Sequence, residues 1–118
     1  MQAVVETSTF QKSAARAGMT ESAVVQLINY LAANPEAGDE IKGTGGCRKV
    51  RVAGRGKGKS GGYRVITFFS GTTIPLFLLH AYSKADRDDL DGKQRNALRA
   101  VTKEIVETYR KTPVRSVK

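Results

Sequence analysis

A glycine-rich basic segment in the middle of the chain constrains the fold more than any other feature. Residues 54–62 consist of Gly, Arg, Lys and Ser alone, and this composition favours neither a helix nor a strand. On either side lie residues 47–53, in which polar and apolar residues alternate, and residues 63–69, which are rich in β-branched and aromatic side chains. Both patterns are typical of strands. The sequence therefore predicts two adjacent antiparallel strands joined by a nine-residue basic loop.

The net charge of the chain is concentrated in the same region. Between Ile41 and Ala85 the sequence has nine Lys or Arg and no Asp or Glu, whereas the rest has eleven basic and eleven acidic residues. The whole net charge of +9 therefore belongs to this central block. A positive field concentrated in this way attracts polyanions, and its arrangement favours nucleic acid as the partner.

The length of 118 residues fits one domain, which we place at residues 1–112, with residues 113–118 as a frayed tail. The hydrophobic fraction of 40% is that of a globular chain. The longest apolar run, residues 76–81, contains His80 and is too short to span a bilayer. We expect a cytoplasmic protein, because no signal peptide is recognisable and a single cysteine, Cys47, cannot form an internal disulfide.

Two helical patterns precede the strands. The first begins with a capping box, in which Ser8 and Gln11 would satisfy exposed backbone N–H groups, and it ends at Gly18. The second begins at Thr20 and ends before Pro35, because the residue before a proline is disfavoured in a helix.

A short strand at residues 3–5, a third long strand at residues 74–82 and a C-terminal helix complete the pattern. Asp91 and Gln94 predict a capping box at the start of that helix, and Pro113 ends it. The sequence therefore predicts an α+β fold, in which two N-terminal helices and a C-terminal helix pack on a mainly antiparallel sheet of about four strands.

Arg64 is the most informative single residue. It lies among apolar residues in a strand with a neighbour on each side, where a guanidinium group is costly to bury without a partner. One interpretation is a structural ion pair with a carboxylate. The other, which we favour, is an arginine that points into a cleft and holds a phosphate with two hydrogen bonds. The candidate carboxylates for the ion pair are Asp86, Asp88 and Asp89.

Other basic residues surround Arg64 in the predicted sheet. Lys49 and Arg51 alternate with valines, so they lie on the solvent or cleft face of their strand, and Lys84 follows the last strand. The basic loop nearly matches a nucleotide-binding P-loop, but strand residues follow it where that motif needs a helix. It is better interpreted as a flexible phosphate grip, with a solvated loop as the alternative.

The remaining residues with reactive or metal-binding side chains are interpreted as structural. His80 and Cys47 are interpreted as packed core residues, not as a base and a nucleophile. The aspartates between residues 86 and 91 lack the glycine and glutamate of a calcium-binding loop, and they are interpreted as a charge cluster at a helix start. We expect no metal and no small-molecule cofactor.

These elements carry a resemblance that covers nearly the whole chain. The order of strand, two helices, antiparallel strands and terminal helix resembles the RelE/ParE superfamily of bacterial toxins. The runs that resemble its HigB-like branch in particular are Gly43–Gly46, Arg48–Arg51, Gly56–Gly62, Tyr63–Arg64 and Tyr82–Lys84. The resemblance implies a RelE-like toxin of a type II toxin–antitoxin pair, which is a ribosome-dependent mRNA endonuclease that inhibits translation and growth in the bacterial cytoplasm. The implied partners are a cognate antitoxin, expected to bind DNA through a helix-turn-helix, and a ribosome with mRNA in its A site.

The resemblance also implies roles for individual residues. In RelE itself the key arginine of the last strand stands one position later, where this chain has Ala85. The candidate catalytic residues are Arg64, Lys84, Lys57 and Lys59, and the candidate RNA-binding residues are Arg48, Lys49, Arg51 and Arg55.

The cleavage that we expect is an attack of the RNA's own 2′-OH on the adjacent phosphate, without a metal and with a lysine as base. Two alternatives remain at this point. One is a ParE-type DNA gyrase poison, and the other is a non-catalytic basic module that binds nucleic acid.

Overall fold

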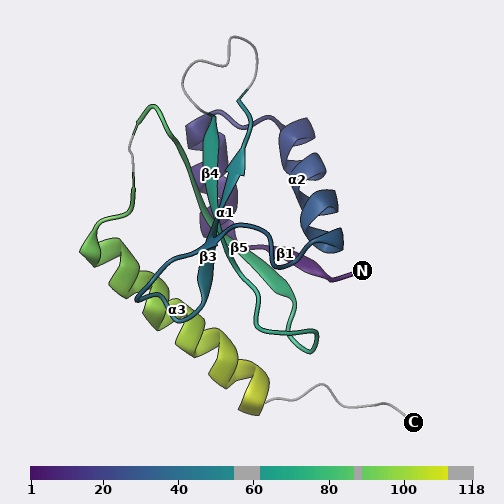
Figure 1. Cartoon of the computed structure of the whole chain (residues 1–118), viewed down its shortest axis with the longest axis vertical. Coiled ribbons are helices and arrows are strands. Elements are labelled where there is room, and N and C mark those ends of the chain that lie inside the picture. Colours follow the sequence, from purple (N-terminus) through teal and green to yellow (C-terminus); the bar gives the residue numbers. More distant parts are fainter. Residues whose placement is uncertain (55–61, 87–88, 112–118) are drawn as a thin grey trace.

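The computed structural model describes residues 1–54, 62–86 and 89–111, which form an α+β fold. One five-stranded sheet, in the order β1-β5-β4-β3-β2, carries helices on both faces (Figure 1). The elements are β1 (Val4–Glu6), α1 (Ser8–Ala17), α2 (Glu21–Ala33), β2 (Asp39–Glu40), β3 (Cys47–Val52), β4 (Tyr63–Phe68), β5 (Leu76–Ser83) and α3 (Gly92–Lys111).

The three central strands confirm the prediction, since β3 pairs with β4 and β4 with β5, both antiparallel. The sheet has one strand more than expected. The additional strand, β2, pairs with Lys49 and Arg48 of β3 at the sheet edge, and its two acidic residues carry no recognisable strand pattern. At the other edge β1 runs parallel to β5.

The start of α1 differs from the prediction. The expected capping box of Ser8 and Gln11 is wrong, because the N-cap is Thr7, whose hydroxyl accepts a hydrogen bond from the Phe10 N–H at 3.1 Å. The same hydroxyl donates to the carbonyl of Leu78 in β5 at 2.8 Å. This hydrogen bond to a distant strand favours Thr7 as the cap. A local sequence pattern gives no information about such a bond, so the prediction missed it.

Three other helix ends confirm the predictions, whereas the predicted end of α3 at Pro113 lies outside the described residues. Thr20 caps α2 by accepting from the Ala23 N–H at 3.1 Å, and Gly18 ends α1 in the left-handed region with φ of 92°. Asp91 and Gln94 form the predicted capping box at the start of α3, with bonds of 2.8 and 3.0 Å in the two directions. Local side-chain bonds therefore fix the starts of α2 and α3, and the backbone conformation of Gly18 fixes the end of α1.

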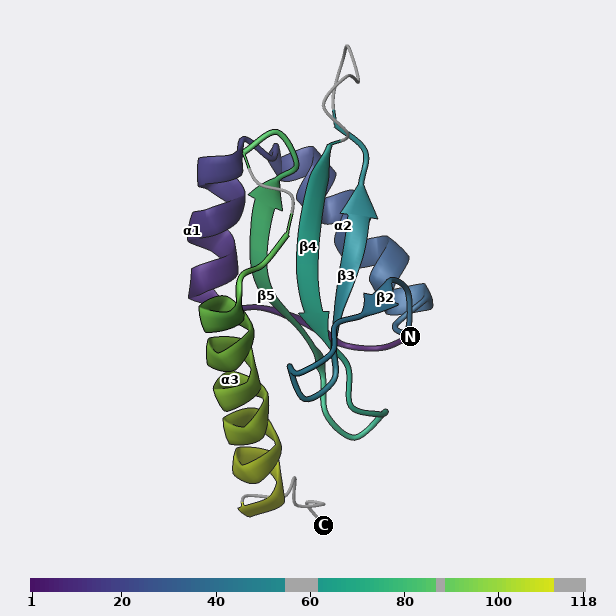
Figure 2. The ribbon, with the colours of Figure 1, turned by 60° about the vertical axis from the view of Figure 1, so that its left-hand side comes forward.

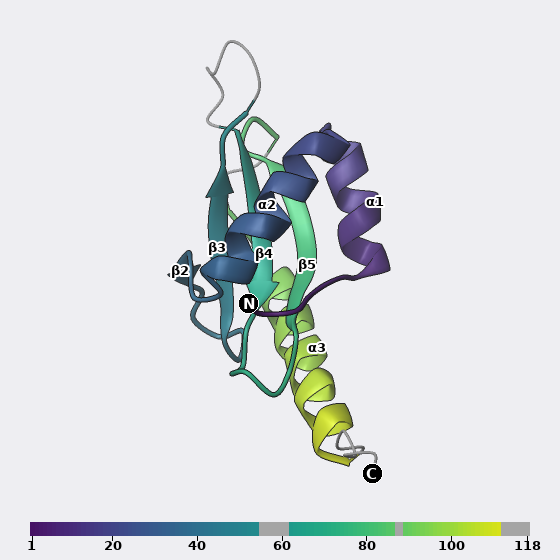
Figure 3. The same ribbon diagram turned by 90° about the vertical axis from the view of Figure 1, so that its right-hand side faces the viewer.

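Side chains of successive strand residues point to opposite faces, so the sheet has a hydrophobic core on each side. Figure 3 shows α1 and α2 on one side of the sheet. Val65 belongs to the core cluster that includes residues of these two helices, whereas its neighbour Ile66 belongs to the cluster that packs against α3. The expected tail at residues 113–118 lies outside the described residues. Among the helices that the structure describes, none is long and apolar enough to cross a membrane.

Candidate nucleic-acid interface

The face of the sheet that carries α3 has two different halves. In one half, Cys47, Ile66 and Phe68 are buried against the apolar side of α3. In the other half the strand register places Arg51 opposite Arg64 and Arg64 opposite Tyr82, so that three polar side chains form one row across β3, β4 and β5. Directly opposite residues have Cβ atoms about 4.5–5.5 Å apart. The row therefore brings two guanidinium groups and a phenol together on one face.

The neighbouring row adds a lysine and a histidine. The register aligns Lys49 with Ile66 and Ile66 with His80, on the same face as the first row. The pairing of β4 with β5 shifts after Ile66, which leaves Leu79 as an additional residue in β5. This β-bulge changes the direction in which the side chains at the end of β5 point. The register between β4 and β5 therefore cannot be predicted from the alternation of residue types.

Arg64 is buried in spite of its charge. The residue is 8% exposed, and its Nη1 donates to the carbonyl of Tyr63 at 3.1 Å. Arg51, its cross-strand neighbour, is exposed. Like charges placed directly opposite one another destabilise a sheet. An anion bound between the two guanidinium groups would relieve this repulsion, and a phosphate fits their planar forks.

Asp89, in the connection between β5 and α3, contacts the cationic face. Its carboxylate pairs with the Lys49 Nζ at 3.2 Å and with Arg95 at 3.5 Å, and it accepts from the Leu90 N–H at 2.8 Å. The Leu90 N–H first, and then Lys49 and Arg95, hold the pKa of Asp89 below its ordinary value of 3.8. The carboxylate thus occupies an anion position beside Lys49. The predicted carboxylate partner Asp88 lies outside the described residues.

Lys84 lies beside the start of the arginine-bearing strand. Its backbone N–H donates to the carbonyl of Gly62 at 2.9 Å, which joins the end of β5 to the residue before β4. Gly62 has φ of 73°, and a Cβ there would collide with the Val52 carbonyl and the Gly54 nitrogen. A glycine at this position therefore lets the ends of β3 and β5 converge on β4.

The structure does not bring Arg48 together with the other predicted binding residues. Arg48 lies on the opposite face of β3, where its guanidinium donates to the Glu36 carbonyl at 3.1 Å and pairs with Glu40 at 3.6 Å. The strand alternation explains the separation, since Arg48 and Lys49 are adjacent and point to opposite faces. The predicted loop residues Arg55, Lys57 and Lys59 lie outside the described residues.

Cys47 is buried, as predicted. Burial is the main cause that raises the pKa of its thiol to about 11, so a thiolate is scarce at neutral pH. Its Sγ lies 3.9 Å from the carbonyl of Thr44, and its backbone N–H donates to the Thr44 hydroxyl at 3.1 Å. These contacts suit a packing role.

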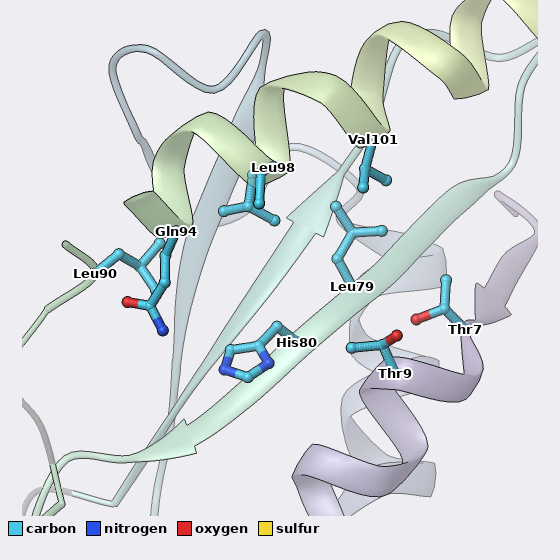
Figure 4. Close-up of a pocket in the computed structure, with 9 residues that line it drawn as sticks. Thr7, Thr9, Leu79, His80, Leu90, Gln94, Leu98 and Val101 are labelled. Atoms are coloured by element: carbon cyan, nitrogen blue, oxygen red, sulfur yellow. The ribbon is translucent and has the colours of Figure 1, made fainter. Parts of the chain in front are cut away.

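His80 is half-buried, not enclosed in the core as the sequence suggested. It lines a cavity of about 280 Å³ between β5, α3 and the start of α1 (Figure 4). The cavity wall is mainly apolar, and Leu79, Leu98 and Val101 contribute to it. The His80 ring also lies 6.1 Å from the ring of Tyr82, measured between centroids. Tyr82, which sequence reasoning missed, therefore connects this cavity to the arginine row.

Two of the aspartates before α3 organise the helix start, as predicted. Asp91 is the cap of α3 and Asp89 is held by two cations and a backbone N–H. In the parts of the chain that the structure describes, no group of three His, Cys, Asp or Glu is arranged to hold a metal ion.

The sequence as a whole matches a family model. Residues 2–115 match the model described as the RelE toxin of the RelE/RelB toxin–antitoxin system. The match includes every strand and helix of the fold and all of the candidate residues above.

Proposed function

We propose that this chain, which belongs to the RelE toxin family, is a ribosome-dependent endoribonuclease that cleaves mRNA and thereby inhibits translation and growth. The observation that carries the proposal is the row in which Arg51 and Arg64 face one another across two strands. Two guanidinium groups on one face, next to Lys49, form a site for the phosphates of an RNA strand.

The proposed reaction uses the substrate's own hydroxyl. The 2′-oxygen attacks the adjacent phosphorus while the bond from phosphorus to the 5′-oxygen breaks, and the products are a 2′,3′-cyclic phosphate and a 5′-hydroxyl. The proton of the 2′-OH passes to a base, and the leaving 5′-oxygen takes up a proton. The protein has to hold the attacking and leaving groups in line and stabilise the negative charge of the pentavalent phosphate.

Each polar residue of the face has a role in this proposal. Arg64 binds two oxygens of the scissile phosphate, and its burial strengthens this interaction by lowering the local dielectric constant. Arg51 and Lys49 bind neighbouring phosphates. Lys84, at the end of β5, is the proposed base, and Tyr82 orients the guanidinium of Arg64 across the strand pair.

The site favours phosphate binding more than proton transfer. The carboxylate that contacts Lys49 belongs to Asp89, whose lowered pKa makes it a weak base at neutral pH. Strong charge stabilisation combined with weak acid–base chemistry supports a dependence on the ribosome, which would supply the remaining geometry. Activity on free RNA is expected to be low.

The proposed protein partner is an antitoxin. The family description names a toxin–antitoxin system, so a cognate antitoxin is the partner to expect. A chain with a net charge of +9 is best neutralised by a partner with acidic and apolar residues, and we propose that this partner also binds DNA through a helix-turn-helix.

The test compares three chains induced in a bacterium: the wild type, Arg64→Ala and Arg48→Ala. Both variants lose one positive charge, but Arg48 lies on the face opposite the proposed site. The 5′ ends of transcripts are mapped genome-wide within minutes of induction. We expect new ends in phase with translated codons in the wild type and in Arg48→Ala, and their loss in Arg64→Ala.

Other outcomes would favour the alternatives. Growth arrest with intact transcripts and DNA damage would replace the nuclease with a gyrase poison. Binding to RNA without new transcript ends in any of the three strains would leave a basic nucleic-acid-binding module. If Lys84→Ala keeps full activity while His80→Ala loses it, the base is the histidine and the assignment of Lys84 is wrong.

A further inference from the structure

The cavity beside His80 has a mainly apolar wall that the proposed reaction does not use. Figure 2 shows the start of α3 below the start of α1, with β5 beside both, and the cavity of about 280 Å³ lies between these three elements. Leu79 of β5 and Leu98 and Val101 of α3 form much of its wall (Figure 4). An apolar cavity of about 150 Å³ holds one benzene ring. This cavity therefore has room for two fused rings, the size of a purine base.

Polar side chains line the same cavity. Thr9, His80 and Gln94 add a hydroxyl, an imidazole and an amide to its lining. Gln94 is held in place by the capping box of α3, because its Oε1 accepts from the Asp91 N–H at 3.0 Å. Sites for small ring systems combine an apolar wall with a few polar groups that fix the orientation of the ligand. A nucleobase has two matching parts, namely flat faces that stack and a polar edge that forms hydrogen bonds.

The cavity is continuous with the arginine row. A second hollow of about 280 Å³ shares His80 and Gln94 with the cavity and extends to Tyr82. Tyr82 stands opposite Arg64 in the row, and the rings of His80 and Tyr82 lie 6.1 Å apart between centroids. Residues two apart in a strand are separated by about 7 Å along it. A nucleotide whose phosphate lies at the row can therefore place its base past His80 in the cavity.

We infer that this cavity binds one unstacked nucleobase of the mRNA, next to the phosphate held by the arginine row. The inference rests on the proposed function and adds a residue set that selects the base beside the cut. The faces of the base lie against Leu79 and Leu98, and its edge lies toward Thr9, His80 and Gln94. Proteins that read single-stranded RNA commonly bind bases that are splayed out of the stack in this way.

An apolar side chain of a protein partner is the less favoured occupant. Such an anchor is normally surrounded by further apolar contacts at the core of an interface. Among the described residues, the exposed large apolar side chains are those of Met1, Val25, Tyr30 and Val101, and only Val101 lines this cavity. The adjoining hollow is lined by Ser13, Arg16 and Asp86, which suit a sugar-phosphate chain better than an apolar interface.

The test fills the cavity and asks whether the protein still recognises a base. Val101→Phe and, independently, Ala97→Phe add a ring at two positions of α3 that line it. Val25→Phe is the matched control, since Val25 lies on α2 in a different hollow and is 48% exposed, compared with 40% for Val101. Melting curves confirm that the variants fold.

The probes are 2′-O-methyl oligoribonucleotides of about 4 nucleotides, which the proposed reaction cannot cleave. In a set of probes, one base at a time is replaced by an abasic residue, and affinity is measured by fluorescence anisotropy. For wild type and Val25→Phe, we expect the loss of one particular base to weaken binding about 10-fold. In the two filling variants the same replacement should change the affinity by less than about 2-fold. This is a double-mutant cycle between the base and the cavity, so a general loss of affinity cancels.

Mapping of transcript 5′ ends gives the same comparison on the ribosome. We expect the wild type and Val25→Phe to prefer certain bases at one fixed position beside the cut. In both filling variants the ends should stay in phase with codons, and this preference should weaken. The phosphate contacts of the arginine row are unchanged in these variants, so a loss of base preference alone is attributable to the cavity.

Other results would overturn the inference. If each abasic replacement has the same effect in all four proteins and the base preference is unchanged, the cavity holds no base, while the nuclease proposal stands. An acidic helical peptide with one central Trp serves as a probe for a protein partner. If the wild type binds it and both filling variants do not, while RNA recognition is unchanged, the cavity is a protein-binding site. If the wild type neither binds the oligonucleotides nor produces codon-phased ends, the inference and the proposed function are refuted together.

Discussion

The facing arginines of the sheet predict an unusual stability change. Replacing Arg51 with Gln keeps most of the side-chain length but removes the repulsion between Arg51 and Arg64 across β3 and β4. With the two charges about 8 Å apart, Coulomb's law gives about 0.5 kcal/mol in the dielectric of water, and the burial of Arg64 makes this a lower bound. Because a change of 1 kcal/mol shifts Tm by about 4–8 °C in a domain near this size, we expect Arg51→Gln to raise Tm by at least about 2–4 °C.

Arg48→Gln is the matched control on the same strand. Arg48 donates to the Glu36 carbonyl at 3.1 Å and pairs with Glu40 at 3.6 Å on the opposite face. Its replacement should therefore lower the free energy of unfolding, by about 0.5–1 kcal/mol. Two identical substitutions three residues apart are thus expected to change stability in opposite directions.

Thermal and urea unfolding at low and high salt would measure both effects. The gain for Arg51→Gln should shrink at about 1 M salt, where the Debye length is about 3 Å. Codon-phased transcript cleavage should fall in Arg51→Gln and persist in Arg48→Gln. The reasoning would be refuted if Arg51→Gln were destabilised, or if its gain in stability were the same at both salt concentrations.

Two further predictions concern titratable groups. Asp89→Asn should lose a modest part of its stability at neutral pH and should bind RNA more tightly, because Lys49 is released from its ion pair. The lowered pKa of Asp89 gives stability that is fully present above pH 3.8 and is lost as the pH falls through the folded-state pKa. The free energies of unfolding of wild type and variant should therefore converge in acid. An unchanged difference between them at low pH, measured by urea titration, would contradict this. Cys47, with a pKa raised to about 11, should resist alkylation by iodoacetamide at pH 8 until the chain unfolds, as followed by mass spectrometry; rapid labelling of the folded protein would show that the thiol is accessible and reactive.

Much of the fold follows from local signals in the sequence. The caps at Thr20 and Asp91 and the end of α1 at Gly18 depend on bonds or backbone angles within a few residues. The long strands follow from residue composition and alternation. The cap at Thr7 was missed because it depends on a partner far along the chain, the carbonyl of Leu78. The edge strand β2 was missed because it consists of two exposed acidic residues, which carry no strand pattern of their own.

The candidate site divides in the same way. Alternation in the run from Arg48 to Arg51 is enough to place Lys49 and Arg51 on one face, and it also places Arg48 on the other. The contact of Arg64 with Tyr82 depends on the register between β4 and β5, which shifts at the bulge after Ile66. No local pattern reports that shift, so the tyrosine of the row became visible only in the structure.

Strand β3 separates two uses of positive charge by side-chain alternation alone. On the face of α2, Arg48 pairs with the Glu40 carboxylate and donates to the Glu36 carbonyl, so its charge stabilises the fold. On the face of α3, Arg51 stands opposite a second arginine, and the register itself maintains the repulsion. A sheet that keeps like charges together is less stable than one that disperses them, and a phosphate bound to both arginines would reverse this balance. Under the proposed function, the arrangement that weakens the free protein is therefore the one that binds the RNA.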